Sequence, residues 1–267
     1  IAIRQARLYQ ASQAQVKELE RLNQLKDDFL STVSHELRTP VTSMRVALQL
    51  LGATLNQELN LNQELLKPKD SQHRVARYYT VLKEECEREI SLINDLLDLQ
   101  RLDGGNHPMT PQRINLVSWL TGIANSFYER AQSRQQAIEI DLPDTLPSVV
   151  SDQASLERVF AELLNNACKY TPPGETIAVT AIASRTDQIL VTVANSGVEI
   201  PAGELPRIFD KFYRVPSADP WKQGGTGLGL ALVQKLLVHI GGDIQVTSDR
   251  TGTAFKITLP LDMTLTV

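Results

Sequence analysis

The feature that most constrains the fold is a long apolar stripe in the first part of the chain. Apolar side chains recur every three or four residues from Val16 to Leu55, which is the spacing of one face of an α-helix. A second such run covers about residues 74–102, and the polar segment between the two runs contains Pro68. The pattern predicts an all-α antiparallel hairpin. Because a lone hairpin leaves part of its stripe exposed to water, we expect a homodimer that forms a four-helix bundle.

A histidine lies on the polar side of the first helix, within "STVSHELRTP", residues 31–40. A turn of about 100° per residue places His35 about 175° from the apolar stripe, so its side chain is expected to face solvent. Glu36 can reach the imidazole edge, Thr39 lies on the same exposed side, and Pro40 loosens the helix at this turn. A surface His beside a Glu is common in proteins and by itself indicates no function. A proline inside a strong helical pattern is uncommon, and it favours a functional role for this turn. A neutral imidazole oriented by a carboxylate is a candidate nucleophile near neutral pH.

Composition excludes several classes of function. The chain has 267 residues, and its 27 basic and 31 acidic residues give a net charge of −4, with no basic run that could follow a phosphate backbone. We therefore expect no nucleic-acid partner. No apolar stretch reaches the roughly 18 residues needed to cross a bilayer, so we expect no membrane contact from this segment. Cys86 and Cys168 lack metal-ligand spacing, which is typical of reduced thiols and a cytoplasmic location. The sequence begins at Ile1, which leaves open a membrane anchor in a missing N-terminal part.

The second part of the chain has a different pattern. The stretch "DGGNHPMTPQ" after Leu102 holds two Gly and two Pro and predicts a linker. Beyond residue 113, helical patterns alternate with short strand patterns, and two pairs of β-rich segments predict hairpins. This grouping predicts an α+β sandwich, a mixed sheet with helices on one face. The expected helices cover residues 116–130, 153–170 and 227–240, and the expected strand segments are "AIEIDL", "PSVVSD", "TIAVTAIASR", "QILVTVANS", "GDIQVTSDR" and "GTAFKITLP".

Two motifs in this part favour phosphate and a metal ion. In "GGTGLGLALVQKLL", Gly225, Gly227 and Gly229 lie where a loop enters a helix, so that backbone amides can approach an anion. In "ELLNNACKYTP", Glu162 and Asn166 are one turn apart and offer oxygen ligands to a hard cation. Magnesium usually completes its shell with substrate phosphates, so the pair fits a metal–nucleotide better than a free metal. A helix-capping turn and a solvated helix surface are the plain alternatives for the two motifs.

Five motifs together resemble those of the sensor histidine kinases. They occur in the order of that family and span about residues 25–260: "STVSHELRTPVTSM" resembles its H box, "ELLNNACKYTP" its N box, "VANSGVEIP" its first Gly box, "RIFDKFYRV" its F box and "GGTGLGLALV" its second Gly box. The resemblance implies four regions: a coiled-coil signalling helix over 1–24, a dimerisation and histidine phosphotransfer hairpin over 25–103, a hinge over 104–112, and a Bergerat-type ATP-binding domain over 113–267.

The resemblance also implies roles for individual residues. His35 would accept the γ-phosphate of ATP, Glu36 would activate the imidazole, and Arg214 would approach the γ-phosphate. Thr39 resembles the residue that positions a water for dephosphorylating the partner, which would be the receiver domain of a response regulator. Asn166 and Glu162 would hold Mg²⁺. The residues expected to contact ATP or its lid are Asn166, Lys169, Tyr170, Asn195, Gly197, Phe209, Phe212, Gly225, Thr226, Gly227, Leu228 and Gly229.

Three positions depart from the pattern of this family. Asn195 stands in place of the Asp that accepts a hydrogen bond from adenine, and the bond to its neutral amide is expected to be weaker by about 1 kcal/mol. Glu199 replaces a Gly, and Glu162 stands where Asn is common. We expect an active kinase of modest ATP affinity. The alternatives are a dimeric scaffold that binds ATP weakly, and an ATP-driven conformational machine of the gyrase or chaperone type, in which His35 would have no role.

Overall fold

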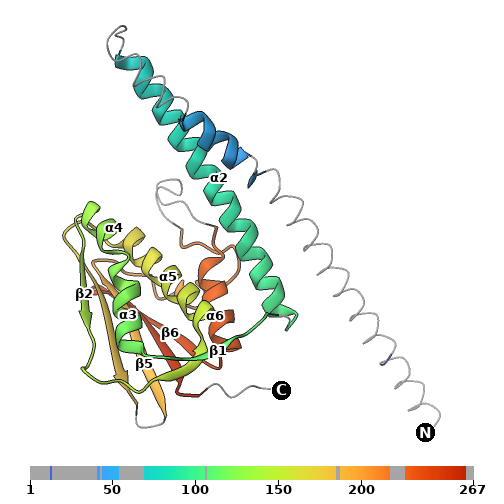
Figure 1. Cartoon of the computed structure of the whole chain (residues 1–267). Helices are drawn as coiled ribbons and strands as arrows, with labels where there is room; N and C mark the ends of the chain where they lie inside the picture. Colours follow the sequence, from blue (N-terminus) through green and yellow to red (C-terminus); the bar gives the residue numbers. More distant parts are fainter. Residues whose placement is uncertain are drawn as a thin grey trace. The chain divides into compact units, whose positions relative to one another are not determined.

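The computed structural model describes residues 13, 41–42, 44–53, 69–105, 107–184, 187–216 and 226–262, with the backbone alone for 69–78. The chain divides into two compact units, Ile1–Gly104 and Gly105–Val267 (Figure 1). Four of the predicted site residues, His35, Glu36, Thr39 and Gly225, lie outside the described residues.

The described residues of the first unit are helical up to Asp103. Residues 44–53 are helical, and α2 runs over Lys69–Asp103 for 35 residues. Gly52 lies against α2, because a Cβ atom on it would be 2.6 Å from Cζ of Tyr79. This contact between the two helical segments supports the predicted hairpin.

The second unit is a two-layer sandwich. Its five-stranded sheet has the order β2-β4-β5-β7-β6, in which β2 and β4 are parallel and the other neighbours are antiparallel. β1 and β3 form a separate antiparallel pair. The elements are β1 Pro111–Ile114, α3 Leu116–Asn125, α4 Tyr128–Ser133, β2 Ala137–Asp141, β3 Val149–Asp152, α5 Gln153–Tyr170, β4 Thr176–Ala183, β5 Gln188–Ser196, η1 Leu205–Arg207, α6 Gly229–His239, β6 Asp243–Asp249 and β7 Gly252–Pro260.

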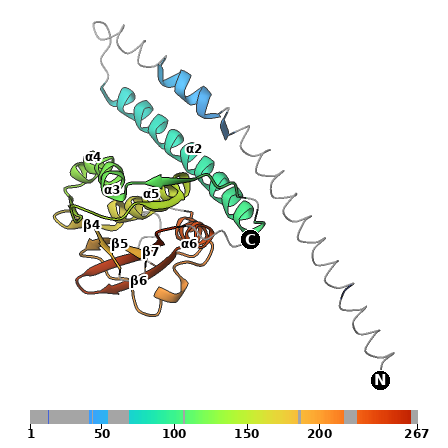
Figure 2. The ribbon, with the colours of Figure 1, turned by 60° about the horizontal axis from the view of Figure 1, so that its bottom comes forward.

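The core lies between the sheet and the helices on one of its faces (Figure 2). Along β5, Ile189, Val191 and Val193 are buried while the residues between them are partly exposed, which is the alternation of a sheet covered on one side. Helix α5 fills the centre of this layer, and its Phe160 meets the Trp119 ring of α3 edge to face, with centroids 5.4 Å apart. The mixed sheet with helices on one face confirms the predicted fold class.

One predicted helix is wrong. Residues 116–130 were expected to form a single helix, but α3 stops at Asn125 and α4 starts at Tyr128. At the break, Ser126 donates its amide to the Gly122 carbonyl and its hydroxyl to the Ile123 carbonyl. These local bonds satisfy the end of α3 and compete with continuation of the helix, as serine side chains commonly do.

Asp152 fixes the start of α5. Its carboxylate accepts a hydrogen bond from the Ser155 amide at 2.8 Å and another from the Thr110 amide at 2.9 Å. Burial raises the pKa of Asp152, but the bonds from Ser155 and Thr110 outweigh it and hold the pKa below the ordinary value of 3.8. One carboxylate therefore caps the central helix and ties β1 to it.

Asp152→Ala is expected to lower the free energy of unfolding by about 1–2 kcal/mol, the usual cost of losing a helix N-cap. Because the folded-state pKa is depressed, the stabilisation is present above the unfolded-state pKa and is lost as the pH falls through the folded-state pKa. Urea unfolding at pH 5 and at pH 3 should therefore show the difference between wild type and variant shrinking at the lower pH. The exposed Asp144→Ala is the matched control, and an equal loss in both variants would contradict the capping role.

Candidate nucleotide-binding site

Helix α5 presents one polar face beside its buried one. Leu163, Leu164 and Ala167 are buried, whereas Glu162, Asn166 and Lys169 are only partly covered. Lys169 Nζ lies 3.0 Å from the Tyr170 hydroxyl and 4.6 Å from the centre of that ring. Glu162, Asn166 and Lys169 therefore share one accessible face of α5, as expected for residues three or four positions apart in a helix.

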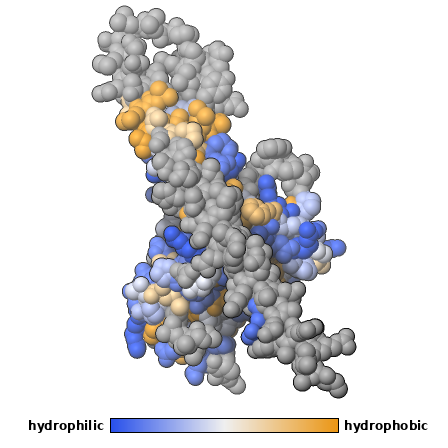
Figure 3. Space-filling view, turned by 90° about the vertical axis from the view of Figure 1, so that its right-hand side faces the viewer, coloured by the Kyte–Doolittle hydropathy of each residue, from blue (hydrophilic) through white to orange (hydrophobic). Residues whose placement is uncertain are grey.

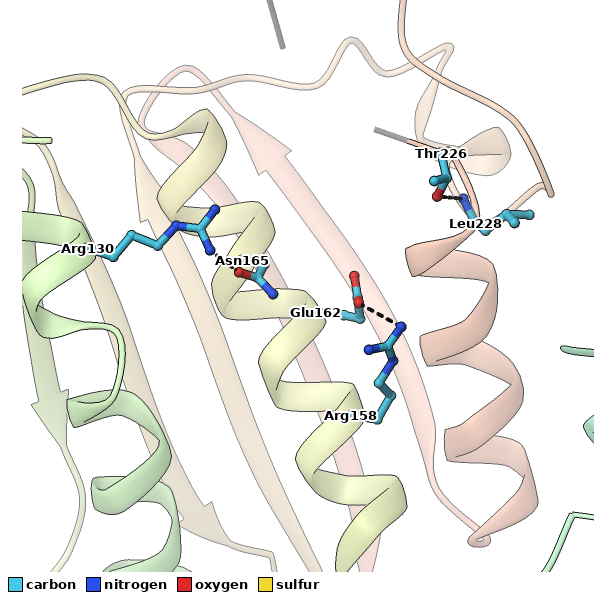
Figure 4. A network of polar contacts seen from close by, with 6 residues as sticks. All are labelled: Arg130, Arg158, Glu162, Asn165, Thr226 and Leu228. Carbon is cyan, nitrogen blue, oxygen red and sulfur yellow. Dashed lines mark hydrogen bonds and ion pairs between the residues drawn. The ribbon is translucent and has the colours of Figure 1, made fainter. Parts of the chain in front are cut away.

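Glu162 reaches from α5 to the start of α6 (Figure 4). Its Oε1 lies 3.4 Å from Nη2 of Arg158, one turn earlier on α5. Its Oε2 lies 2.6 Å from the point that a Cβ atom of Gly229 would occupy. The acidic residue of the N box and the last glycine of the second Gly box are thus neighbours, although 67 positions separate them in the sequence.

The end of the second Gly box is held against the F box. Gly227 has φ +72°, and its carbonyl accepts the Phe212 amide at 2.9 Å. A Cβ atom on Gly227 would lie 2.8 Å from the Phe212 carbonyl carbon. Thr226 Oγ1 accepts the Leu228 amide at 3.2 Å, and Leu228 itself is fully buried (Figure 4). Two predicted motifs therefore meet through backbone, at a point where only glycine fits.

The F box presents both partly covered and exposed side chains. Phe209 is half-buried, while Phe212 is 62% exposed and has φ +64°, an uncommon value for an aromatic residue. Arg214, expected near the γ-phosphate, is exposed and makes a polar contact. Arg214 follows two residues after Phe212, whose amide donates a hydrogen bond to the Gly227 carbonyl.

Asn195 is the last residue but one of β5 and lies on the helix-covered side of the sheet. The residue is 7% exposed, and its Nδ2 has no hydrogen-bond partner within the described part of the chain. An unpaired buried amide is unfavourable, so a ligand that accepts a hydrogen bond would relieve the cost. The following Gly197 has φ +73°, and Glu175 crowds its Cα, so this turn also needs glycine.

Glu199 does not obstruct this turn. Its side chain is exposed, and it is not among the described residues with positive φ. A residue with a side chain therefore fits at this position without backbone strain.

Two residues that support the first Gly box were not predicted from sequence. Thr253 Oγ1 donates to the Val198 carbonyl at 2.9 Å, and Ser248 Oγ accepts the Ile200 amide at 2.8 Å. Ser248 and Thr253 are direct cross-strand partners whose hydroxyls lie 2.7 Å apart. The strand register of the predicted hairpin over residues 243–260 could have shown from sequence that Ser248 and Thr253 lie opposite each other.

The donor chemistry at α5 fits a hard cation. A carboxylate and an amide oxygen one turn apart are suitable ligands for Mg²⁺ when substrate phosphates complete its shell. Within the described ranges, no group of three or more His, Cys, Asp or Glu side chains could hold a metal ion. No helix in the described part is long and apolar enough to cross a membrane.

Two family models match the chain. Residues 25–105 match the His Kinase A (phospho-acceptor) domain, and residues 151–263 match the "Histidine kinase-, DNA gyrase B-, and HSP90-like ATPase" family. Their order is that of the two units described above.

Curated relatives agree with this arrangement. The sensor histidine kinase WalK of Bacillus subtilis is 34% identical over 251 residues, a match covering 92% of this chain and 38% of WalK. The sensor histidine kinase CusS of Escherichia coli K12 is 32% identical over 248 residues, covering 92% of this chain and 48% of CusS. The chain thus spans less than half the length of these relatives.

A solved structure agrees as well. Full-length ShkA in complex with AMPPNP superposes with a TM-score of 0.69 at 26% identity, covering 87% of this chain and 45% of that one. Acinetobacter baumannii histidine kinase AdeS, 21% identical with a TM-score of 0.55, shares the fold over 85% of this chain and 98% of its own. With both family models in order and relatives of 32–34% identity over nine tenths of its length, the chain carries the catalytic core of the sensor histidine kinases.

Proposed function

We propose that this chain autophosphorylates His35 from ATP and passes the phosphoryl group to an aspartate on the receiver domain of a response regulator. The observation that supports this most is the meeting of α5 and α6, where the polar face of Glu162 and Asn166 adjoins the N-terminus of α6. If Glu162 and Asn166 hold a cation, it would lie beside a helix end that favours phosphate, which supports the proposal. The similar ShkA structure holds AMPPNP, an ATP analogue, which is consistent with this assignment.

The proposed reaction has two steps that balance. The imidazole of His35 attacks the γ-phosphorus, a P–N bond forms, the bond to the β,γ-bridging oxygen breaks, and ADP leaves while Glu36 takes the imidazole proton. The phosphoryl group then moves to the aspartate carboxylate of the regulator, which restores the histidine. When bound, Mg²⁺ neutralises the charge of the phosphates. Asn166, Glu162, Lys169 and Arg214 would position the nucleotide. Thr39 would position the water that hydrolyses the aspartyl phosphate of the regulator and releases inorganic phosphate.

We also propose a homodimer through the first unit. The first unit carries a hydrophobic surface patch (Figure 3). In the described part of this unit, the large apolar residues that are exposed are Met44, Val46, Leu50, Leu51, Val81 and Leu82. Each is 46–64% exposed, and together they exceed what scattered surface apolar residues would explain. Pairing with a second hairpin would cover them.

The test of this function is the chemistry of the phosphorylated residue. Incubation with γ-labelled ATP and Mg²⁺ is expected to give a label that survives base and is lost in acid, as a phosphoramidate would be. Tryptic peptide 27–38 should carry it, because His35 is the single histidine between Lys26 and Arg38. An acid-stable label, or a label elsewhere, would refute the proposal.

The alternative is a dimeric scaffold whose ATP binding is weak or lost, and it rests on Asn195, which lacks the charge of a carboxylate, and on Glu199. It predicts no binding of a magnesium–ATP analogue at millimolar concentration. Titration calorimetry of the whole chain separates the two proposals directly.

A further inference from the structure

We propose that His107 and His239 form a binding site for Zn²⁺ or a similar transition-metal ion, separate from the nucleotide site. His107 lies in the segment that leads into β1, and His239 is the last residue of α6. Their rings meet edge to face, with centroids 5.3 Å apart and planes at 73°. Neither residue is among those proposed for the kinase reaction, so the inference does not depend on that function.

The separation of the two rings is the one that a shared metal ion requires. In tetrahedral coordination the Zn–N distances are about 2.0–2.1 Å, which places each ring centre about 3.2 Å from the metal and the two centres about 5.2 Å apart. The observed 5.3 Å matches this value. Metal binding would thus require rotation of the rings but no change in the distance between them.

Each ring offers a nitrogen to a metal ion. His107 Nδ1 donates a hydrogen bond to the Pro108 carbonyl at 3.1 Å, since a carbonyl oxygen can only accept. With the proton on Nδ1, a neutral imidazole carries its free lone pair on Nε2, and a backbone carbonyl is a usual second partner of a metal-binding histidine. His239 Nε2 is buried and has no hydrogen-bond partner within the described residues. An unpaired buried nitrogen is unfavourable, and a metal ion would give it a partner.

The segment that carries His107 is also held at its other end. Thr110 donates its amide to Asp152 at 2.9 Å, so residues 107–110 are fastened both to the end of α6 and to the start of α5. Burial raises the pKa of Asp152, whereas the hydrogen bonds from Ser155 and Thr110 and the charge of His107 lower it. The Asp152 carboxylate is therefore close enough to His107 for its negative charge to favour a cation there.

Two imidazoles select the kind of metal. Imidazole suits Zn²⁺, Cu²⁺ and Ni²⁺, whereas Mg²⁺ prefers oxygen ligands, so Mg²⁺ would not compete for this pair. Because no group of three or more His, Cys, Asp or Glu side chains in the described part of the chain could hold a metal ion, water would fill the remaining positions. We therefore expect an exchangeable ion and not a closed structural site. Since His107 follows the end of α2 by four residues, the ion would fix the point at which the linker joins the second unit.

The experiment measures the Zn²⁺ affinity of the whole chain by competition with a chelating dye, in excess Mg²⁺ and without nucleotide. Wild type is expected to bind at micromolar concentration, and His107→Gln and His239→Gln are each expected to weaken binding by at least about tenfold. The double variant should lose no more than either single variant, because removing one of two ligands already dismantles a shared site. Thermal unfolding without metal shows whether each variant is folded. His107→Gln alters no helix or strand, so it keeps the test decisive if His239→Gln does not fold.

His73→Gln and Cys86→Ser are the controls. They remove another histidine and another thiol from outside the pair, and both should bind Zn²⁺ as wild type does. Wild-type affinity in a folded His107→Gln protein, losses that add in the double variant, or an equal loss in His73→Gln would each overturn the proposal. Failure of the wild type to bind Zn²⁺ at submillimolar concentration would overturn it as well. None of these results bears on ATP binding or labelling, so the proposed kinase function is tested separately.

Discussion

His35→Gln is expected to abolish the acid-labile label completely. Glutamine keeps a polar side chain of similar size but has no nucleophilic ring nitrogen, so no P–N bond can form. Nucleotide affinity is expected to stay within about twofold of wild type, because the substitution leaves every proposed nucleotide-binding residue unchanged. The proposed ATP-site residues lie within the second compact unit, Gly105–Val267, whereas His35 belongs to the first. Loss of label with retained binding would separate the phosphoacceptor from the nucleotide site.

His73→Gln is the matched control for this substitution. His73 lies in the same unit, on α2, and has no proposed role. Its substitution by glutamine makes the same chemical change as His35→Gln. Labelling of this variant should equal that of wild type. Full labelling of His35→Gln, or equal loss in both variants, would contradict the assignment of His35.

Much of the fold was predictable because its signals are local. The pattern of apolar residues predicted α5 over residues 153–170, and the structure has the same bounds. The two hairpins were predicted from alternating β-rich segments, and β4–β5 and β6–β7 are antiparallel neighbours. The strand β1 was missed because "PQRI" has no alternation and is stabilised by its pairing with β3, a partner 35 or more residues away.

The candidate site was only partly predictable, since its decisive contacts join distant segments. Spacing could place Glu162 and Asn166 on one face of a helix, but not Glu162 against Gly229. Likewise, the Gly-rich loop predicted an anion site but gave no sign that Gly227 is held by Phe212. Tertiary packing determines these pairs, and no short-range pattern in one sequence carries them.

Gly227→Ala is expected to weaken nucleotide binding by at least about tenfold, with a matching loss of His35 labelling. A left-handed backbone costs a residue with a Cβ about 1–2 kcal/mol, and 1.4 kcal/mol is a factor of ten in affinity. Two backbone atoms of Phe212 would lie 2.8 and 2.9 Å from the new Cβ, so the F box must also shift. Phe212 already has φ +64°, which leaves its backbone little freedom to adjust. The expected result is a displaced lid at the start of α6, where the phosphates would bind.

Gly203→Ala is the control for Gly227→Ala. Gly203 has no neighbour within 4 Å of its Cβ position and is not among the described glycines with positive φ, so alanine should fit there. Calorimetric titration with a magnesium–ATP analogue measures affinity, and thermal unfolding without nucleotide shows whether each variant is folded. A folded Gly227→Ala protein that binds as tightly as Gly203→Ala would show that the contact between Phe212 and Gly227 does not shape the site. A folded protein with weak binding would show that glycine is required there because the F box and the lid share one backbone contact.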